Sequence, residues 1–348
     1  MPHALNESLS DLLRATSRSF YLTLRVLPAA VRQQIGLAYL LARTTDTVAD
    51  TEIVPIAKRL DALQQLRERI LGRSSAALNF GELARQQGAP AEKRLLEEVG
   101  ASLAALPRVS TDDQERIRDV LAVIISGQEL DLRRFGSGAK PVVALATAEE
   151  LDDYTYRVAG CVGEFWTKIC RAHLFPAVPL DDAQLLADSV RFGKGLQLVN
   201  ILRDLPADLK SGRCYLPRAE LAEIGLTPED LGNPQNEPRL RPLYDRWLDR
   251  AEGHLFAGWH YTNTLPRNCR RVRLACAWPV LIGLETTRRL RDSAVLAPEV
   301  RIKVSRREVR KILARSILRL PFPGWWRQLV AEPSASAGKA VASRTHLA

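Results

Sequence analysis

Apolar residues recur at three- and four-residue steps along most of the chain, the spacing that places them on one face of an α-helix. β-branched residues rarely alternate with polar residues, so nearly every periodic stretch favours a helix over a strand. The sequence therefore predicts an all-α protein. The predicted helices span residues 7–26, 31–50, 56–71, 92–105, 111–134, 148–172, 181–209, 241–264, 270–292 and 306–319.

Two stretches rich in turn-forming residues, 135–147 and 225–242, interrupt the helices and are predicted to be surface loops within one domain. Composition changes again after Leu320, so we divide the chain into a domain at 1–320 and a flexible, small-residue tail at 321–348. Within that tail, Trp325 and Trp326 either insert into a membrane interface or fold back onto the helices. The sequence does not choose between these alternatives.

Composition indicates where in the cell the protein is located but leaves its function open. The 348 residues contain five cysteines without a C-x-x-C motif, no export signal at the first residues, and no apolar stretch long enough to span a bilayer. We therefore expect a cytoplasmic protein. The net charge of +10 is compatible with anionic substrates, acidic lipid or nucleic acid.

Two pairs of aspartates carry the strongest chemical signal. Asp46 and Asp50 are four residues apart, and so are Asp204 and Asp208. That spacing places two carboxylates one helical turn apart, where they repel each other unless a cation lies between them. Magnesium prefers oxygen ligands and commonly bridges carboxylates to substrate phosphates. The duplication predicts an enzyme that acts on diphosphates.

Arginines accompany both pairs. Arg43 shares the helix face of Asp46, and Arg203 and Arg213 flank the second pair. A guanidinium group suits bidentate binding of phosphate oxygens. The alternative for each arginine is a solvated ion pair worth less than about 1 kcal/mol.

Three long motifs give the chain a family resemblance. They are SRSFYLTLRVLPAAVRQQIGLAYLLARTTDTVAD from Ser17, YTYRVAGCVGEFW from Tyr154 and QLVNILRDLPADLKSGRCYLP from Gln197. Together they resemble the squalene and phytoene synthase family of head-to-head prenyl transferases, and the likeness extends over about 17–307. The resemblance implies an isoprenoid-synthase-type helical bundle around a central apolar pocket.

The resemblance also implies roles for the polar residues. The four aspartates would hold Mg²⁺, with Mn²⁺ as the alternative, against the departing pyrophosphate. Arg43, Arg203 and Arg213 would bind phosphate oxygens, and Tyr154 would be the general acid/base that removes the proton. Gln197 and Asn200 match family positions that orient substrate and metal-bound water, although ordinary amide hydrogen bonding inside a bundle is the alternative.

An allylic cation must be shielded from water, so apolar residues matter as well. Phe20 and Tyr39 would present aromatic faces to the cation. Val158 and Val162 lie in a small-residue stretch that lets isoprenoid chains approach the helix backbone. Close helix packing is the alternative interpretation of the small residues, and core packing that of the aromatic residues.

The family divides over its products. Our leading hypothesis is the condensation of two farnesyl diphosphates to presqualene diphosphate, followed by NADPH-dependent conversion to squalene. The region around Cys276 and Pro279 favours a squalene synthase, and Lys303 with Arg306 would meet the NADPH phosphates. However, Ala275 stands where animal and fungal squalene synthases carry a phenylalanine. The alternative is a phytoene, dehydrosqualene or presqualene diphosphate synthase without the reductive step.

The residue pattern disfavours two other classes of function. A nucleic-acid-binding protein is disfavoured because basic residues are interspersed with acidic ones and paired aspartates would repel a phosphate backbone. A prenyl-lipid carrier has no reason to bear the cost of four converging acids. We predict no nucleic-acid partner and no obligate protein partner. Peripheral association with the inner face of the membrane through the C-terminal segment stays one of the two alternatives given for Trp325 and Trp326.

Overall fold

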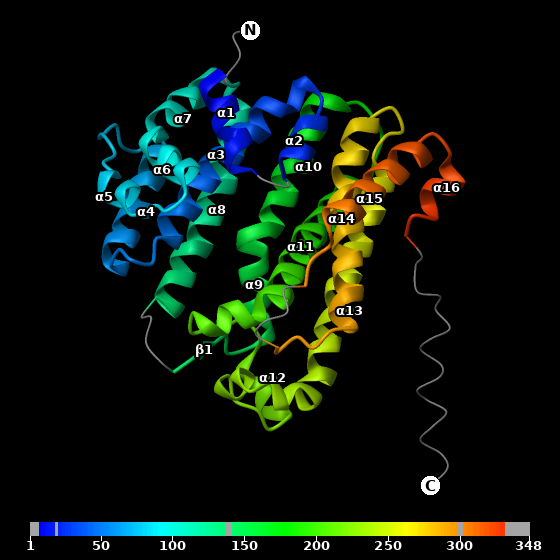
Figure 1. Cartoon of the computed structure of the whole chain (residues 1–348). Helices are drawn as coiled ribbons and strands as arrows, with labels where there is room; N and C mark the ends of the chain where they lie inside the picture. The colour runs from blue at the N-terminus through cyan, green and yellow to red at the C-terminus, as the bar shows by residue number, and fades with distance from the viewer. Residues whose placement is uncertain (1–6, 18–19, 137–140, 298–301, 331–348) are drawn as a thin grey trace.

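Helices account for almost all regular structure in the computed structural model, which describes residues 7–17, 20–136, 141–297 and 302–330 (Figure 1). The only pairing of strands in these residues is β1 (Val143–Ala144) with β2 (Arg213–Cys214), parallel and two residues long. The all-α expectation is confirmed. The α-helices are α1 Glu7–Thr16, α2 Phe20–Val26, α3 Ala29–Asp50, α4 Ile56–Ile70, α5 Gly81–Arg85, α6 Pro90–Glu97, α7 Val99–Ala105, α8 Thr111–Phe135, α9 Ala148–Thr155, α10 Cys161–Leu174, α11 Asp182–Lys210, α12 Arg218–Glu223, α13 Glu237–Thr264, α14 Arg270–Arg291, α15 Arg306–Arg319 and α16 Pro323–Arg327.

Long helices form the body of the molecule. Helix α11 packs along α13 and also contacts α10 and α14, while α8 packs against α3, α4 and α10. Helices α4, α6 and α7 pack against α3 on the left of Figure 1, and α15 and α16 lie outside α14 on the right. The site described below lies between α3 and α8 on one side and α11 on the other.

Helix α8 shows how the packing pattern leads into that site. Ile117, Leu121 and Ile124 are buried at four- and three-residue steps, as expected for a core-facing stripe. The same stripe continues through Gln128 and Asp131, which are polar. One face of α8 therefore packs the core along most of its length and lines a polar cavity near its end.

Several predicted helices are divided. The prediction 7–26 becomes α1 and α2, with residues 18–19 outside the described part, and 92–105 becomes α6 and α7. The second break lies at Glu98, whose φ of −97° and ψ of 12° depart from helical values. The prediction 148–172 contains a π-helical turn at Tyr156–Gly160. Side-chain periodicity persists through such short breaks, so it does not reveal them.

The two predicted loops contain more structure than expected. Strand β1 lies in the first, 135–147, of which residues 137–140 are outside the described part. The second, 225–242, contains two 3₁₀ turns, and α13 begins at Glu237 rather than at residue 241.

The chain continues in packed form beyond residue 320. In α16, the indole of Trp326 stacks on Trp259 at 5.2 Å between ring centroids and donates a hydrogen bond to Asn263 Oδ1 at 2.8 Å. Trp325, by contrast, is exposed. The two alternatives proposed for this segment thus divide between neighbouring residues: Trp326 folds back, and Trp325 faces solvent. Residues 331–348 lie outside the described part, so the division of the chain at 320 stays a prediction.

Within the described ranges, none of the helices combines the length and apolarity needed to cross a bilayer. The cytoplasmic location stays a prediction.

Candidate functional site

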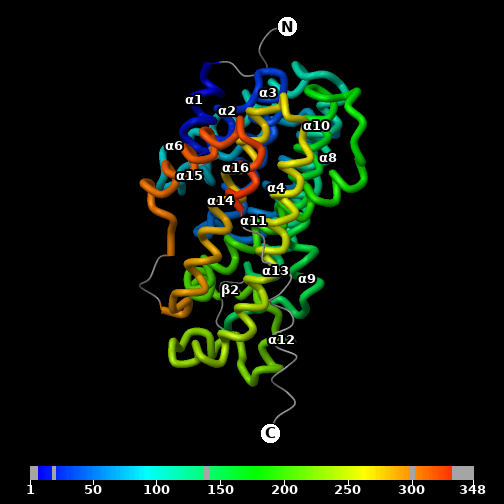
Figure 2. The backbone as a smooth tube through the Cα atoms, turned by 90° about the vertical axis from the view of Figure 1, so that its right-hand side faces the viewer, coloured from blue at the N-terminus to red at the C-terminus, as the bar shows by residue number. Residues whose placement is uncertain are grey.

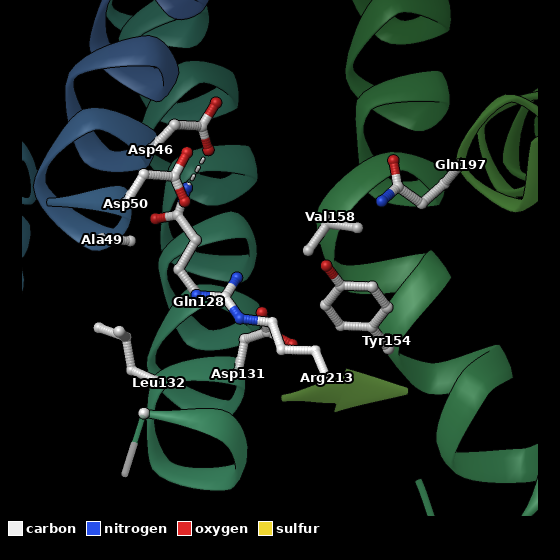
Figure 3. A pocket seen from close by; sticks show the side chains of 11 residues that line it. Asp46, Ala49, Asp50, Gln128, Asp131, Leu132, Tyr154, Val158, Gln197 and Arg213 are labelled. Atoms are coloured by element: carbon white, nitrogen blue, oxygen red, sulfur yellow. Dashed lines mark hydrogen bonds between the residues drawn. The ribbon is translucent and has the colours of Figure 1, made fainter. Parts of the chain in front are cut away.

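A cavity of about 270 Å³ lies where α3, α8, α11 and the π-helical turn converge (Figure 3). Its walls are both charged and apolar. The lining residues are Asp46, Ala49, Asp50, Gln128, Asp131, Leu132, Gly136, Tyr154, Val158, Gln197 and Arg213. Six of the residues selected from the sequence meet here: Asp46, Asp50, Tyr154, Val158, Gln197 and Arg213.

The first carboxylate pair lies on the last turns of α3. Confinement in the cavity and the nearby charge of Asp50 raise the pKa of Asp46 to about 6. The pKa of Asp50 is also raised, chiefly by burial. The side-chain amide of Gln128 donates a hydrogen bond to Asp46, and Arg43 approaches Asp46 at 3.7 Å while pairing with Glu92 at 2.7 Å. One cation thus neutralises only part of this acidic cluster.

The second pair lies near the end of α11 and is arranged differently. Arg203 donates two hydrogen bonds to Asp204, from Nε to Oδ1 at 2.9 Å and from a terminal nitrogen to Oδ2 at 2.5 Å. Burial and the charge of Asp204 raise the pKa of Asp208 to about 7. Neither aspartate lines the cavity of Figure 3 directly, but the charges of Asp131 and Arg213 on its wall act on Asp208.

A hydroxyl–carboxylate chain connects Tyr154 to the cavity wall. Tyr154 donates to the Tyr215 hydroxyl at 3.4 Å, and Tyr215 donates to Asp131 Oδ2 at 2.9 Å. The two tyrosine rings stack with centroids 4.9 Å apart. Burial raises the pKa of Tyr154 and of Tyr215, so both hydroxyls are protonated at neutral pH. Burial also raises the pKa of Asp131 to about 6, which suits exchange of a proton near neutrality.

Sequence reasoning missed Gln128, Asp131 and Tyr215. Tyr215 stands inside a quoted motif, two residues after Arg213, but no spacing rule connects it to Tyr154. For Gln128 and Asp131 a signal existed, because they occupy positions of α8 where the three- and four-residue pattern calls for apolar residues.

A second cavity, of about 580 Å³, is lined by α2, α11, α14, α15 and residues preceding α15. Gln197 of α11 faces the first cavity, whereas Leu196, Val199, Asn200 and Arg203 face the second, so this helix lies between the two. Most of the second lining is apolar, including Trp278 and Leu313. Asn200, Arg203 and Lys303 therefore line a different cavity from Asp46 and Asp50.

The remaining selected residues lie elsewhere. The hydroxyl of Tyr39 donates to the Thr16 carbonyl at 3.3 Å while its ring packs against the core, so it does not line the first cavity. Val162 is 37% exposed, and Arg306 is exposed outside both linings. The side chain of Phe20 lies outside the described part.

The small residues beside Val162 serve helix packing. A Cβ at Gly163 would lie 2.0 Å from the Ser189 carbonyl oxygen, and one at Gly193 would lie 2.2 Å from that of Ala159. Glycine at these positions allows α10 and the π-helical turn to approach α11 closely.

The donor set fits magnesium in its chemistry. Within the described ranges, no three His, Cys, Asp or Glu side chains lie together as a complete metal site. The side chains are nevertheless oxygen donors on both α3 and α11, and the buried oxygens Gln128 Oε1 and Asp131 Oδ1 lack a hydrogen-bond partner there. An ion that completes its shell with water and substrate phosphate suits such an open arrangement.

Known proteins of one family resemble the chain. Residues 13–308 match the family model described as squalene/phytoene synthase. The chain is 32% identical over 270 residues to the presqualene diphosphate synthase of Zymomonas mobilis, covering 76% of this chain and 80% of that protein. It is 29% identical over 309 residues to the 15-cis-phytoene synthase of Synechococcus elongatus, covering 83% and 84%.

A fungal relative is larger. The bifunctional lycopene cyclase/phytoene synthase of Blakeslea trispora is 30% identical over 287 residues, which cover 78% of this chain but 43% of the relative. The chain thus spans less than half of that protein's length.

Solved structures share the fold. The chain superposes on TcSQS in complex with the ligand E5700 with a TM-score of 0.74 at 20% identity, covering 95% of this chain and 94% of that one. For the squalene synthase HpnC of Alicyclobacillus acidocaldarius the TM-score is 0.56 at 21% identity, covering 82% and 97%. The helical bundle and the family match agree, and the chain belongs to the squalene/phytoene synthase family of prenyl transferases.

Proposed function

We propose that the protein condenses two farnesyl diphosphates head to head into presqualene diphosphate and then converts this intermediate to squalene with NADPH. The observation that carries the first step is the charged cavity in which Asp46, Asp50 and Arg213 face Tyr154 (Figure 3). Carboxylates whose pKa values are raised by burial and by mutual repulsion favour a bound cation. Such a cation neutralises a diphosphate as it leaves.

The four aspartates Asp46, Asp50, Asp204 and Asp208 would hold Mg²⁺ or Mn²⁺ between the two helices. The bound metal supplies Lewis-acid stabilisation of the departing pyrophosphate. Arg213, whose buried Nε lacks a partner among the described side chains, would bind phosphate oxygens at the same wall. Arg43 would assist from the far side of Asp46. Ala49, Leu132 and Val158 exclude water from the allylic cation left behind.

Closure of the cyclopropane ring requires loss of one proton from the joined carbon skeleton. We assign this step to Tyr154, as the sequence predicts, and extend it through Tyr215 to Asp131. Tyr154 accepts the proton at its hydroxyl oxygen while passing its own to Tyr215, which in turn passes one to Asp131. The raised pKa of Asp131, about 6, lets its carboxylate receive that proton near neutral pH.

The second cavity bears on the reductive step. Exposed Lys303 lines the second cavity and fits contact with a phosphate of NADPH, whereas Arg306 lies outside that lining. Ala275 is buried. The nearby indole of Trp278 lines the second cavity and donates to Ser316 Oγ at 2.9 Å, so it is the aromatic residue available to replace the missing phenylalanine.

A second candidate function ends at presqualene diphosphate. Two observations favour it: alanine at position 275, and likeness to the presqualene diphosphate synthase of Zymomonas mobilis. Phytoene and dehydrosqualene synthesis share the first reaction, and phytoene synthases are equally among the relatives.

Product analysis tests these proposals together. Purified protein is incubated with farnesyl diphosphate and magnesium, with and without NADPH. Squalene only with NADPH is the expected result. Presqualene diphosphate in both tubes would support the second candidate, dehydrosqualene or an alcohol would overturn the reductive step, and release of no pyrophosphate would overturn the transferase itself. A parallel reaction with geranylgeranyl diphosphate tests the assignment of chain length.

A further inference from the structure

Exposed apolar side chains gather on one part of the molecule. Of the seven large apolar side chains exposed in the described residues, four lie between 317 and 325. They are Ile317, Leu318, Phe322 and Trp325, with exposed fractions of 50%, 71%, 52% and 58%. The rings of Phe322 and Trp325 contact each other at 5.0 Å between centroids. We call the outward sides of α15 and α16 the C-terminal surface; both helices lie outside α14 (Figures 1 and 2).

The same surface carries concentrated positive charge. Residues 306–327 include seven arginines and lysines and one acid, Glu308. The carboxylate of Glu308 already has partners, because it forms a capping box with Ser305 and an ion pair with Arg289. Arg310, Lys311 and Arg315 are exposed and form no ion pair with another residue of the described ranges. Their charge is therefore available to a partner.

Contacts on the inner sides of α15 and α16 hold these helices in place, and the residues on their outer sides are not needed for this. Ser316 accepts a hydrogen bond from Trp278, and Trp326 is buried against Trp259 and Asn263. The exposed apolar residues contribute little to these contacts. Their exposure is thus a property of the folded state, and a patch of this kind commonly marks an interaction site.

We propose that the C-terminal surface docks the protein onto a lipid bilayer that contains anionic phospholipid, with α15 lying in the plane of the interface. Charge complementarity selects this occupant, because unpaired basic residues beside Leu318, Phe322 and Trp325 match a surface that is anionic outside and apolar beneath. Tryptophan is also enriched where membranes meet water. One of the two sequence alternatives, peripheral association, is thereby assigned to specific residues.

The inner side of α15 adds a consequence that rests on the proposed function. Val309 and Leu313 of this helix line the second cavity, opposite the docking side. A docked α15 would separate an apolar cavity from the bilayer by the thickness of one helix. A hydrocarbon product would then have a short path into the membrane.

Vesicle sedimentation tests the docking itself. The full chain, without metal or substrate, is mixed with vesicles of phosphatidylcholine alone or of phosphatidylcholine with phosphatidylglycerol. We expect binding to the anionic vesicles that weakens as salt is added. R310Q/K311Q should weaken partitioning about 30-fold, because each basic residue near an anionic surface contributes about 1 kcal/mol. L318S should weaken it about 10-fold through lost burial of one leucine.

Matched controls separate this surface from general charge and hydrophobicity. Ile53→Ser removes an apolar side chain that is 72% exposed, close to the 71% of Leu318. R85Q/R108Q removes two exposed charges far from α15. Both controls should bind like the parent, and circular dichroism should confirm that every variant is folded.

Three results would overturn the proposal. They are a parent protein that stays unbound with anionic vesicles, equal losses in the controls, or equal binding to phosphatidylcholine alone. Self-association that L318S abolishes, without vesicle binding, would instead assign the surface to contact between copies of the chain. Because no turnover is measured, these outcomes are independent of the proposed reaction.

Discussion

The two carboxylate pairs have the same spacing in sequence but different surroundings in the fold. Asp46 and Asp50 line the cavity, and Arg43 lies between Asp46 and Glu92. Asp204 instead accepts hydrogen bonds from Arg203, and burial together with the charge of Asp204 raises the pKa of Asp208. The pKa is raised to about 6 at Asp46 and to about 7 at Asp208. Identical spacing therefore places the two pairs among different charged partners, and we expect the pairs to respond differently when those partners are removed.

Asp131 connects the two pairs. Its negative charge raises the pKa of Asp208, and the charge of Asp50 in turn raises the pKa of Asp131. Protonation at one point of this acidic wall therefore makes ionisation easier at the next. The wall functions as one electrostatic unit, and the predictions below separate its members.

The largest expected effect comes from the first pair. Asp46→Asn should lower turnover roughly 10³-fold or more, because a neutral amide weakens the metal that stabilises the departing pyrophosphate. Steady-state kinetics at saturating magnesium measures the loss, and calorimetry measures magnesium affinity. Asp61→Asn, on the exposed side of α4, is the matched control. Full turnover in the Asp46 variant would contradict the metal assignment.

A smaller loss of activity is expected when Tyr154 or Tyr215 is replaced. Tyr154→Phe should lower cyclopropane formation roughly 10²-fold while substrate binding persists, since only proton transfer is removed. Tyr215→Phe removes the hydrogen bond that lowers the pKa of Asp131, so the acidic limb of the pH–rate profile should move to higher pH. Rapid-quench analysis and pH profiles check these outcomes. Parent-like rates and profiles in both variants would remove the proton chain from the mechanism.

Magnesium binding at the second pair should depend on Arg203, which donates two hydrogen bonds to Asp204. Arg203→Gln removes a charge that lowers the pKa of Asp208, so this pKa should rise and magnesium binding near neutral pH should weaken by about 10-fold. Magnesium titrations at pH 6.5 and 8.5 test the direction, since the deficit should shrink at the higher pH. Arg218→Gln, an exposed arginine after β2, serves as the control. An unchanged magnesium affinity would show that Arg203 does not lower the pKa of Asp208.

The smallest effect concerns stability. A carboxyl group with a raised pKa in the fold stabilises the folded protein while protonated, and this contribution is lost as pH rises through the folded pKa. For Asp46, Asp131 and Asp208 the loss falls between about pH 4 and 7. The metal-free thermal midpoint should therefore drop by a few degrees, roughly, from pH 5 to pH 7.5. Calorimetry with and without magnesium checks this, and a rising midpoint would contradict the raised pKa values.

Sequence was sufficient for most of the helices and for several residues that line the first cavity, while the roles of these residues stay predictions. The two aspartate pairs, Arg43 and the segment from Tyr154 to Val158 followed from local patterns and family likeness. Helix breaks at Glu98 and over the π-helical turn were missed, because they preserve the phase of the apolar stripe.

Contacts between distant segments were beyond the sequence. Tyr215 follows β2 in the chain, yet it contacts Asp131 of α8 and Tyr154 of α9, far away in sequence. Likewise, spacing did not reveal that α11 separates Gln197 from Asn200 and Arg203 into two cavities, because a helix face is defined only once its neighbours are known. Gln128 and Asp131 are the exception, since polar residues on a buried stripe were visible in advance.

A crystal structure with Mn²⁺ and a non-reactive thiolo analogue of farnesyl diphosphate tests the central claim most directly. Anomalous scattering locates the ions without assumptions about their ligands. We predict manganese at both Asp46/Asp50 and Asp204/Asp208, with the diphosphate between the two helices. Manganese at only one pair, or a diphosphate bound away from both, would contradict the shared role of the two carboxylate pairs.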